Sequence, residues 1–141
     1  MIIIMKYKEL ETFYNVLTKS VFKNMKVNRG KAKLLNKLTE KDTEYVEFRK
    51  DILKNYAELD EKGELKVDEN NNFKLLENAD ITKLNNDLLE LDNEDVVFES
   101  GEYSDRFTDF LEALSNSEFE YDNQEILLID KILEQFEKKE K

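Results

Sequence analysis

The chain has 141 residues and a formal net charge of −11, and charged residues make up 39% of it. Cysteine and histidine are both absent, which excludes disulfides, Ser-His-Asp and Cys-His catalysis, and the usual zinc ligands. Proline is absent and glycine occurs three times, so we expect long helices with few interruptions. No stretch approaches the roughly 20 apolar residues that span a bilayer, and no cleavage site follows the apolar N-terminus. We therefore expect a cytoplasmic protein.

The first half of the chain predicts one extended segment and two helices. Residues 2–7 are predicted to form a short strand or an extended arm, followed by a helix over about residues 7–22. A long helix is expected over about residues 29–59, because apolar side chains recur there every seven residues. This heptad stripe consists of Leu38, Tyr45, Ile52 and Leu59. Such spacing is typical of a helical hairpin or a short coiled coil, and Gly63 is predicted to end the run.

The second half predicts a small β element and further helices. Residues 64–76 predict a β-hairpin, because apolar and polar residues alternate around a polar turn. Helices are expected over about residues 80–91 and 104–114. Residues 96–99 predict a short strand that could pair with the N-terminal segment. The sequence shows no internal repeat.

The last helix has a clear start signal. Asp122 and Glu125 have the spacing of a capping box, in which each side chain accepts a hydrogen bond from the other residue's backbone N–H. Residues 137–141 are predicted to form a solvated tail. The apolar stripe of this helix is predicted to consist of Ile126, Ile129, Leu133 and Phe136. Together these elements predict a single domain over residues 1–141 that is mainly α, at the margin of α+β, with about five helices.

Charge is distributed unevenly along the sequence. Residues 1–54 carry a net charge of +6 and residues 55–141 one of −17, which together give the total of −11. Residues 87–125 contain 14 acidic residues and one basic residue, whereas residues 23–41 contain seven basic residues and one acidic residue. The simplest interpretation is that both blocks are solvated faces, which could also attract one another across the fold.

The acidic block is the candidate binding surface. Its carboxylates create a negative field that attracts cationic partners and repels nucleic acid. An acidic protein can thus occupy the positive groove of a protein that normally grips phosphates. Aromatic side chains rimmed by acids are also typical of binding hot spots. The residues predicted to bind a partner are Asp92, Glu94, Asp95, Glu99, Glu102, Tyr103, Asp105, Asp109 and Glu112.

Two other patterns point to different ligands. The basic block at residues 23–41 could bind nucleic acid directly, but it holds a single arginine and no aromatic residue after Lys26, which disfavours that reading. Alternate acidic and amide residues between Asp68 and Asn72 match the opening of an EF-hand loop. Phe73 and Ala79 replace the glycine and the glutamate that such a loop requires, so this segment predicts a polar turn and no metal site.

Three segments carry a resemblance that covers nearly the whole chain. They are Met5-Lys6-Tyr7-Lys8-Glu9-Leu10, Lys31-Ala32-Lys33-Leu34-Leu35, and Tyr56-Ala57-Glu58-Leu59-Asp60-Glu61-Lys62-Gly63-Glu64-Leu65. A short Val96-Val97-Phe98 stretch and an acidic helical end follow them. In this layout the chain resembles a family of small uncharacterised proteins encoded by phages and prophages of low-GC Gram-positive bacteria. The resemblance implies a phage setting inside a host cell, and no activity or functional residue comes with it.

We expect a non-enzymatic protein without a cofactor that binds a basic protein partner and no membrane. The most specific hypothesis is that the protein is a phage-encoded, anti-CRISPR-like inhibitor. It would bind a nucleic-acid-binding host defence protein and compete with the nucleic acid for it. One alternative is a virion structural or assembly protein that self-associates through the long helix into a homo-oligomer. Another is a metal-dependent nuclease, for which Glu64-Leu65-Lys66 has the short Glu-x-Lys form and Asp60 lies upstream.

Overall fold

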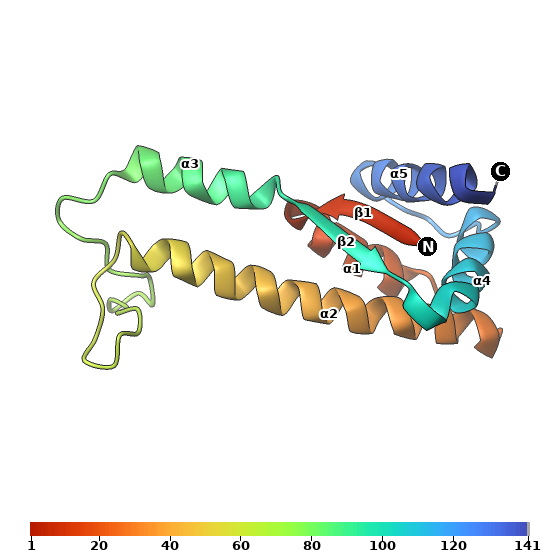
Figure 1. Ribbon diagram of the computed structural model, residues 1–141, viewed down its shortest axis with the longest axis horizontal. Coiled ribbons are helices and arrows are strands. Elements are labelled where there is room, and N and C mark those ends of the chain that lie inside the picture. Colours follow the sequence, from red (N-terminus) through yellow and green to blue (C-terminus); the bar gives the residue numbers. More distant parts are fainter. Residues whose placement is uncertain (141) are drawn as a thin grey trace. The chain divides into compact units, whose positions relative to one another are not determined.

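The computed structural model describes residues 1–140, most of which are helical (Figure 1). The main elements in chain order are β1 (Ile2–Lys6), α1 (Leu10–Lys19), α2 (Met25–Lys54), α3 (Ile81–Asp92), β2 (Asp95–Glu99), α4 (Ser104–Ser115) and α5 (Asn123–Glu140). Two short 3-10 helices, η1 (Tyr7–Glu9) and η2 (Gly101–Tyr103), precede α1 and α4. The prediction of a mainly α fold with five helices and a small β element is confirmed over these residues.

The chain divides into two compact units that share the long helix α2. Unit 1 contains Met1–Asp42 together with the chain from Asp95 onward, and unit 2 contains Thr43–Glu94. The single domain over residues 1–141 therefore stays a prediction. Residues 137–140 of the predicted tail continue α5, and Lys141 lies outside the described residues. None of the helices over residues 1–140 is both long and apolar enough to cross a membrane.

Unit 1 contains the predicted pairing of the N-terminal segment with residues 96–99. β1 and β2 are antiparallel, and Ile4 lies opposite Val97. Alternate residues of the two strands face inward and are at most 2% exposed: Ile3, Met5, Val96 and Phe98. Phe98 meets Phe13 of α1 edge-on, with ring centroids 5.6 Å apart. The period-2 alternation of these apolar residues thus places one face of the sheet in the core.

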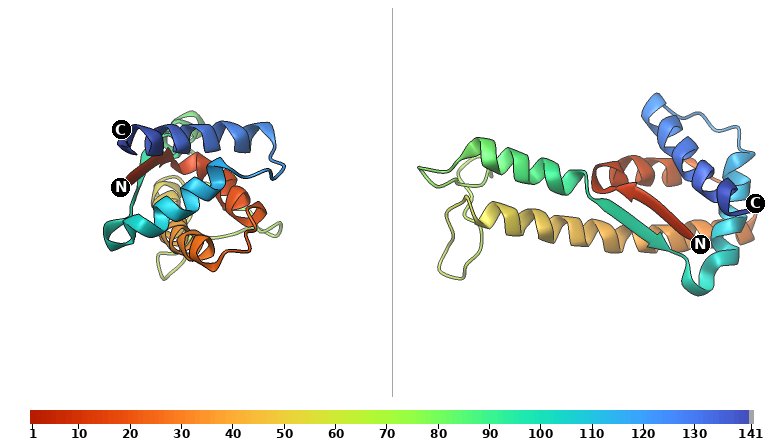
Figure 2. Two further views of the ribbon diagram at one scale, coloured as in Figure 1. Left: turned by 90° about the vertical axis from the view of Figure 1, so that its right-hand side faces the viewer. Right: turned by 45° about the horizontal axis from the view of Figure 1, so that its top comes forward.

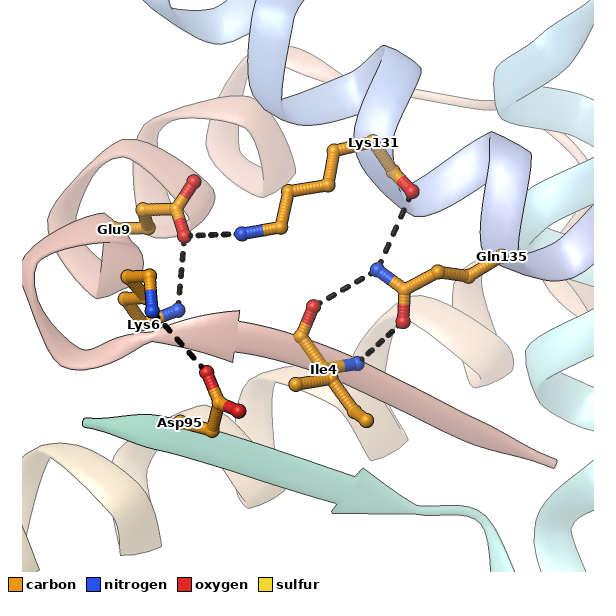
Figure 3. Close-up of polar contacts among 6 residues, drawn as sticks. All are labelled: Ile4, Lys6, Glu9, Asp95, Lys131 and Gln135. Atoms are coloured by element: carbon orange, nitrogen blue, oxygen red, sulfur yellow. Dashed lines mark hydrogen bonds and ion pairs between the residues drawn. The ribbon is translucent and has the colours of Figure 1, made fainter. Parts of the chain in front are cut away.

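Helix α5 closes the outer edge of β1 (Figure 3). The side-chain amide of Gln135 accepts a hydrogen bond from the Ile4 backbone N–H at 2.7 Å and donates one to the Ile4 carbonyl at 2.8 Å. Nearby, Glu9 accepts bonds from the Lys6 backbone N–H and from the Lys131 ammonium, both at 2.8 Å. α5 also packs against α1 (Figure 2). These contacts satisfy backbone groups that an edge strand would leave unpaired.

The predicted capping box begins α5, but of the predicted apolar stripe of that helix only Phe136 is buried, and Ile129 and Leu133 are half-buried. Asp122 and Glu125 exchange side-chain to backbone hydrogen bonds of 2.8 Å in both directions. The Glu125 side chain is 2% exposed and pairs with the Lys19 ammonium at 2.5 Å, which raises the pKa of Lys19. Because Glu125 turns inward, the buried positions follow its face of the helix, and Ile126 is 50% exposed. The buried residues are Leu128, Ile132 and Phe136.

The long helix begins at Met25 and ends at Lys54, so both predicted bounds, 29 and 59, are wrong. Gly30 lies within its first turns, where a Cβ atom would be 2.1 Å from the backbone oxygen of Arg106 in α4. Glycine therefore allows α2 and α4 to approach closely. At the other end, the Tyr56 N–H donates to the Leu53 carbonyl, which closes a turn after the helix. Tyr56, Leu53 and Leu84 of α3 form the buried cluster of unit 2.

Residues 57–75 of unit 2 form a closed ring of three short arms, of which the predicted hairpin at 64–76 supplies two. Antiparallel bridges join Leu59 to Leu65, Val67 to Phe73, and Ala57 to Leu75. The middle residue of each arm donates its N–H to the carbonyl of another arm. These bonds run from Lys66 to Glu58 at 3.0 Å, from Lys74 to Lys66 at 3.0 Å, and from Glu58 to Lys74 at 2.8 Å. Gly63, predicted to end the helix, lies instead in a turn of this ring.

Two turns of the ring are built alike, and they correct the prediction that the sequence contains no internal repeat, since Asp-Glu follows an apolar residue at both 60–61 and 68–69. Asp60 accepts bonds from two backbone N–H groups, two and four residues later, at 2.8 and 2.9 Å. Asp68 does the same at 2.8 and 3.0 Å. Gly63 and Asn71 occupy the same place in their turns, with φ of 79° and 66°. The corresponding arms lie eight positions apart in the sequence, beginning at Ala57, Leu65 and Phe73.

Candidate partner-binding surface

The nine residues predicted to bind a partner are divided between the two units. Asp92 and Glu94 belong to unit 2, whereas the other seven belong to unit 1. In unit 1, Asp95 and Glu99 lie on β2, Glu102 and Tyr103 in η2, and Asp105, Asp109 and Glu112 on α4. Of these seven, Glu102, Tyr103, Asp105 and Asp109 line one cleft, whereas Glu99 lines a separate hollow. Most of the nine are exposed, and the half-buried ones are Asp92, Tyr103 and Asp109.

Basic side chains from the start of α2 lie against the acidic residues of α4. Lys26 and Arg106 each have a nitrogen atom 3.6 Å from an oxygen of Asp109. The Lys33 ammonium lies 4.3 Å from the centroid of the Tyr103 ring, within the range of a cation–π contact. These groups line a cleft of about 540 Å³ that also contains Arg29, Glu102, Asp105 and Thr108. The basic block therefore neutralises part of the negative field around α4.

Unit 2 contains a groove whose charged side chains are all acidic. It has a volume of about 440 Å³ and lies between the second half of α2 and α3. Phe48, Ile52 and Leu91 give it an apolar lining, and Phe48 is 45% exposed. Within the described part of the chain, no basic side chain lines this groove. Its four carboxylates belong to Asp51, Asp87, Glu90 and Glu94.

Tyrosine hydroxyls hold two carboxylates at or near the groove. The Tyr56 O–H donates to Asp87 at 2.5 Å, and this bond is the main reason why the pKa of Tyr56 is raised to about 12. The Tyr45 O–H donates to Asp92 at 2.6 Å. Burial and then this bond raise the pKa of Tyr45. The other three carboxylates of the groove are exposed: Asp51, Glu90 and Glu94.

Sequence reasoning identified one of the four groove carboxylates, Glu94. It missed Asp51 because this residue precedes the acidic block and reaches the groove from another helix. The sequence did contain a signal for Asp87 and Glu90. Asp87, Glu90 and Glu94 are spaced by three and four positions, which places their side chains on one side of the chain where α3 ends.

The segments considered for metal chemistry form turns of the three-arm ring. Asp68 uses its carboxylate to accept two backbone N–H bonds, as expected for a polar turn. Glu64 of the Glu-x-Lys motif ends the preceding turn, where its N–H donates to Asp60. Among the residues that the structure describes, no group of three or more Cys, His, Asp or Glu side chains is placed to hold a metal ion.

Comparison with known proteins shows the family of the chain. The whole chain, residues 1–141, matches the family described as "Protein of unknown function (DUF1617)", and the chain belongs to this family. No curated protein and no solved structure matches it. The expected membership of an uncharacterised family is thereby confirmed, whereas the phage origin stays a prediction.

Proposed function

We propose that this protein is a non-enzymatic binding protein that holds a basic partner in the acidic groove of unit 2. The observation that carries this proposal is the lining of the groove, where four carboxylates surround apolar side chains without a basic residue. A lysine or arginine side chain suits this lining, because its aliphatic stem packs on apolar surface while its charged end reaches the carboxylates. Phe48 and Leu91 would contact the stem, and Glu90 and Glu94 the charge.

The most specific form of the proposal is a phage-encoded inhibitor of a host nucleic-acid-binding defence protein. A chain with a net charge of −11 repels nucleic acid and is attracted to the positive surfaces that bind it. Inhibition would then be competition, in which the acidic groove occupies basic side chains that otherwise contact phosphates. In unit 1, the exposed residues Glu102, Asp105 and Glu112 would add to the negative field.

The contacts of the heptad stripe favour partner binding over self-association through that stripe. Leu38 is 4% exposed and belongs to the core. Tyr45 donates its hydroxyl to Asp92, and Ile52 packs against the buried cluster of unit 2. A homo-oligomer built on this stripe would need these side chains at its interface.

The test is capture of host proteins by the purified protein at low and high salt. A groove variant, Asp51→Asn/Glu90→Gln/Glu94→Gln, is compared with a control that removes equal charge elsewhere, Glu118→Gln/Glu120→Gln/Glu134→Gln. We expect the wild type and the control to capture a nucleic-acid-binding protein at low salt and to release it at high salt. The groove variant should capture much less. Equal capture by both variants, or capture that salt does not weaken, would overturn the proposal.

A further inference from the structure

Strand β2 has an unpaired outer edge. The Ile4 backbone turns away from β2 to bond Gln135, and residues directly opposite in an antiparallel pair share this orientation. The N–H and C=O groups of Val97 therefore point away from β1, as do those of Asp95 and Glu99, two positions to either side. Over residues 1–140, the hydrogen bonds of the chain leave the outward backbone groups of Val97 and Glu99 unpaired.

This edge opens onto a hollow beside α2. The hollow has a volume of about 270 Å³ and is lined by Val97 and Glu99 of β2 and by Lys37, Glu40 and Lys41 of α2. The unit 1 part of α2 runs beside β2 on the side away from β1 (Figures 1 and 2). An extended peptide in this corner would continue the sheet and place alternate side chains over α2.

We propose that β2 binds an extended segment of a partner protein as a third strand, and that this segment carries basic residues two positions before and after an apolar one. Strand addition gains affinity from backbone hydrogen bonds and specificity from alternate side chains. The side chains that face such a segment on the exposed side of β2 are Asp95, Val97 and Glu99, in the order acidic, apolar, acidic. Asp95 also pairs with the Lys6 ammonium of β1 at 3.3 Å, and its side chain stays 65% exposed. Opposite charges in directly facing cross-strand pairs are stabilising.

The same charges disfavour a second copy of β2 as the third strand. In an antiparallel register centred on Val97, Asp95 would face Glu99 of the copy at both ends, and like charges in facing pairs are destabilising. Charged edge strands are a common protection against such self-pairing. Lys37 and Lys41 of α2 line the far side of the hollow, so the fit to a basic segment of another protein comes from the exposed side of β2 alone. This surface lies in unit 1, belongs to a different recognition mode, and does not depend on the acidic groove.

The test uses the full chain labelled with 15N and a capped peptide, Thr-Lys-Thr-Ile-Thr-Lys-Thr, as the probe. We expect the amide signals of β2 to shift on titration, and exchange of the Val97 amide hydrogen to slow by roughly tenfold or more at saturation. Two control peptides should cause neither effect. One carries glutamate in place of both lysines, and the other is N-methylated at its isoleucine, which removes the central donor while keeping both charges.

Two protein variants complete the test. Val97→Pro removes an outward N–H without removing a bond between β1 and β2, so it should abolish binding, whereas Val97→Thr should not. The variant Asp95→Lys/Glu99→Lys should no longer bind the lysine peptide and should bind the glutamate peptide instead. If Val97→Pro fails to fold, this variant provides the test. The groove variant should bind the lysine peptide as well as the wild type does, so the two proposals can fail separately.

Three results would overturn this proposal. The first is the absence of β2 shifts with the lysine peptide. The second is equal binding of the N-methylated peptide, which would show a purely electrostatic contact. The third is concentration-dependent dimerisation with the same β2 shifts in the absence of peptide, which would make a second copy the occupant.

Discussion

Tyr56 and Asp87 connect the two helices of unit 2 through a hydrogen bond of 2.5 Å between the phenol and a carboxylate oxygen. Tyr56 follows α2 and is 9% exposed, and Asp87 lies in α3 on the lining of the acidic groove. The bond thus couples the buried cluster of unit 2 to the surface proposed to bind a partner. A residue of the core fixes the position of one of the groove carboxylates.

This bond predicts a pH dependence at high pH. The pKa of Tyr56 is about 12 in the folded protein against the ordinary value of 10. Because the raised value favours the neutral phenol when folded, its stabilisation is fully present below pH 10 and is lost as pH rises from 10 to 12. The difference in free energy of unfolding between the wild type and Tyr56→Phe should therefore shrink across this range.

Urea denaturation at pH 9 and pH 11.5 measures this difference. Tyr14 is 52% exposed, and Tyr14→Phe serves as the control, whose difference from the wild type should stay small at both pH values. A difference for Tyr56→Phe that grows between the two pH values would contradict the assignment.

Replacing Gly30 in helix α2 by alanine is predicted to lower the free energy of unfolding, although this substitution usually raises it in a helix. Gly30→Ala would normally stabilise a helix by about 0.5–1 kcal/mol. Here the added Cβ would lie 2.1 Å from the Arg106 backbone oxygen, so we expect a loss of about 1–3 kcal/mol from overpacking. Chemical denaturation gives the value, with Asn36→Ala on the exposed side of α2 as the control. A stabilised Gly30→Ala variant would show that α2 and α4 do not approach as described.

Two substitutions at Glu125 separate its role in the capping box of α5 from its ion pair with Lys19. Glu125→Gln keeps an oxygen that accepts the Asp122 N–H but loses the charge that pairs with Lys19. Glu125→Ala loses both, so it should be less stable than Glu125→Gln by about 1 kcal/mol, the usual value of a cap. Thermal and urea unfolding of both variants, beside Glu120→Ala on the surface, provide the comparison. Equal stability of the two Glu125 variants would mean that the cap contributes nothing.

The repeated turns of unit 2 make a matched pair of predictions. Gly63 and Asn71 both have positive φ, a conformation that costs a residue with a Cβ roughly 1 kcal/mol. Gly63→Ala and Asn71→Ala should each lower stability by about that amount, and Asn71→Gly should not. Hydrogen exchange of the Lys66 and Lys74 amides reports on the ring directly. Unchanged exchange in both alanine variants would contradict the shared geometry.

Parts of this fold could be predicted from the sequence because their signals are local. The apolar run Val96-Val97-Phe98 predicted β2, and Asp122 with Glu125 predicted the start of α5. Two arms of the ring were predicted as the hairpin at 64–76, whereas the arm at 57–59 was assigned to the long helix, because Leu59 continues the heptad spacing. The stripe of α5 was misplaced because its buried face begins with a charged residue, Glu125, whose partner Lys19 lies far away in the sequence.

The candidate site also depends on contacts between residues that lie far apart in the sequence. The acidic block was visible as composition, but neutralisation of Asp109 by Lys26 depends on the tertiary packing of α4 and α2. The groove likewise combines Asp51 and Asp87 from two helices. A count of charges along the chain gives the sign of a surface, whereas the fold decides which carboxylates remain available to a partner.

The most direct test of the central claim places a photo-crosslinking phenylalanine derivative at Phe48, inside the acidic groove, and irradiates the protein in host lysate. The same derivative at Tyr14, in unit 1, is the control. We predict a crosslink from position 48 to a nucleic-acid-binding protein, weakened by added nucleic acid because both ligands compete for the same basic surface. A crosslink pattern that is the same at both positions, or that nucleic acid leaves unchanged, would contradict binding through this groove.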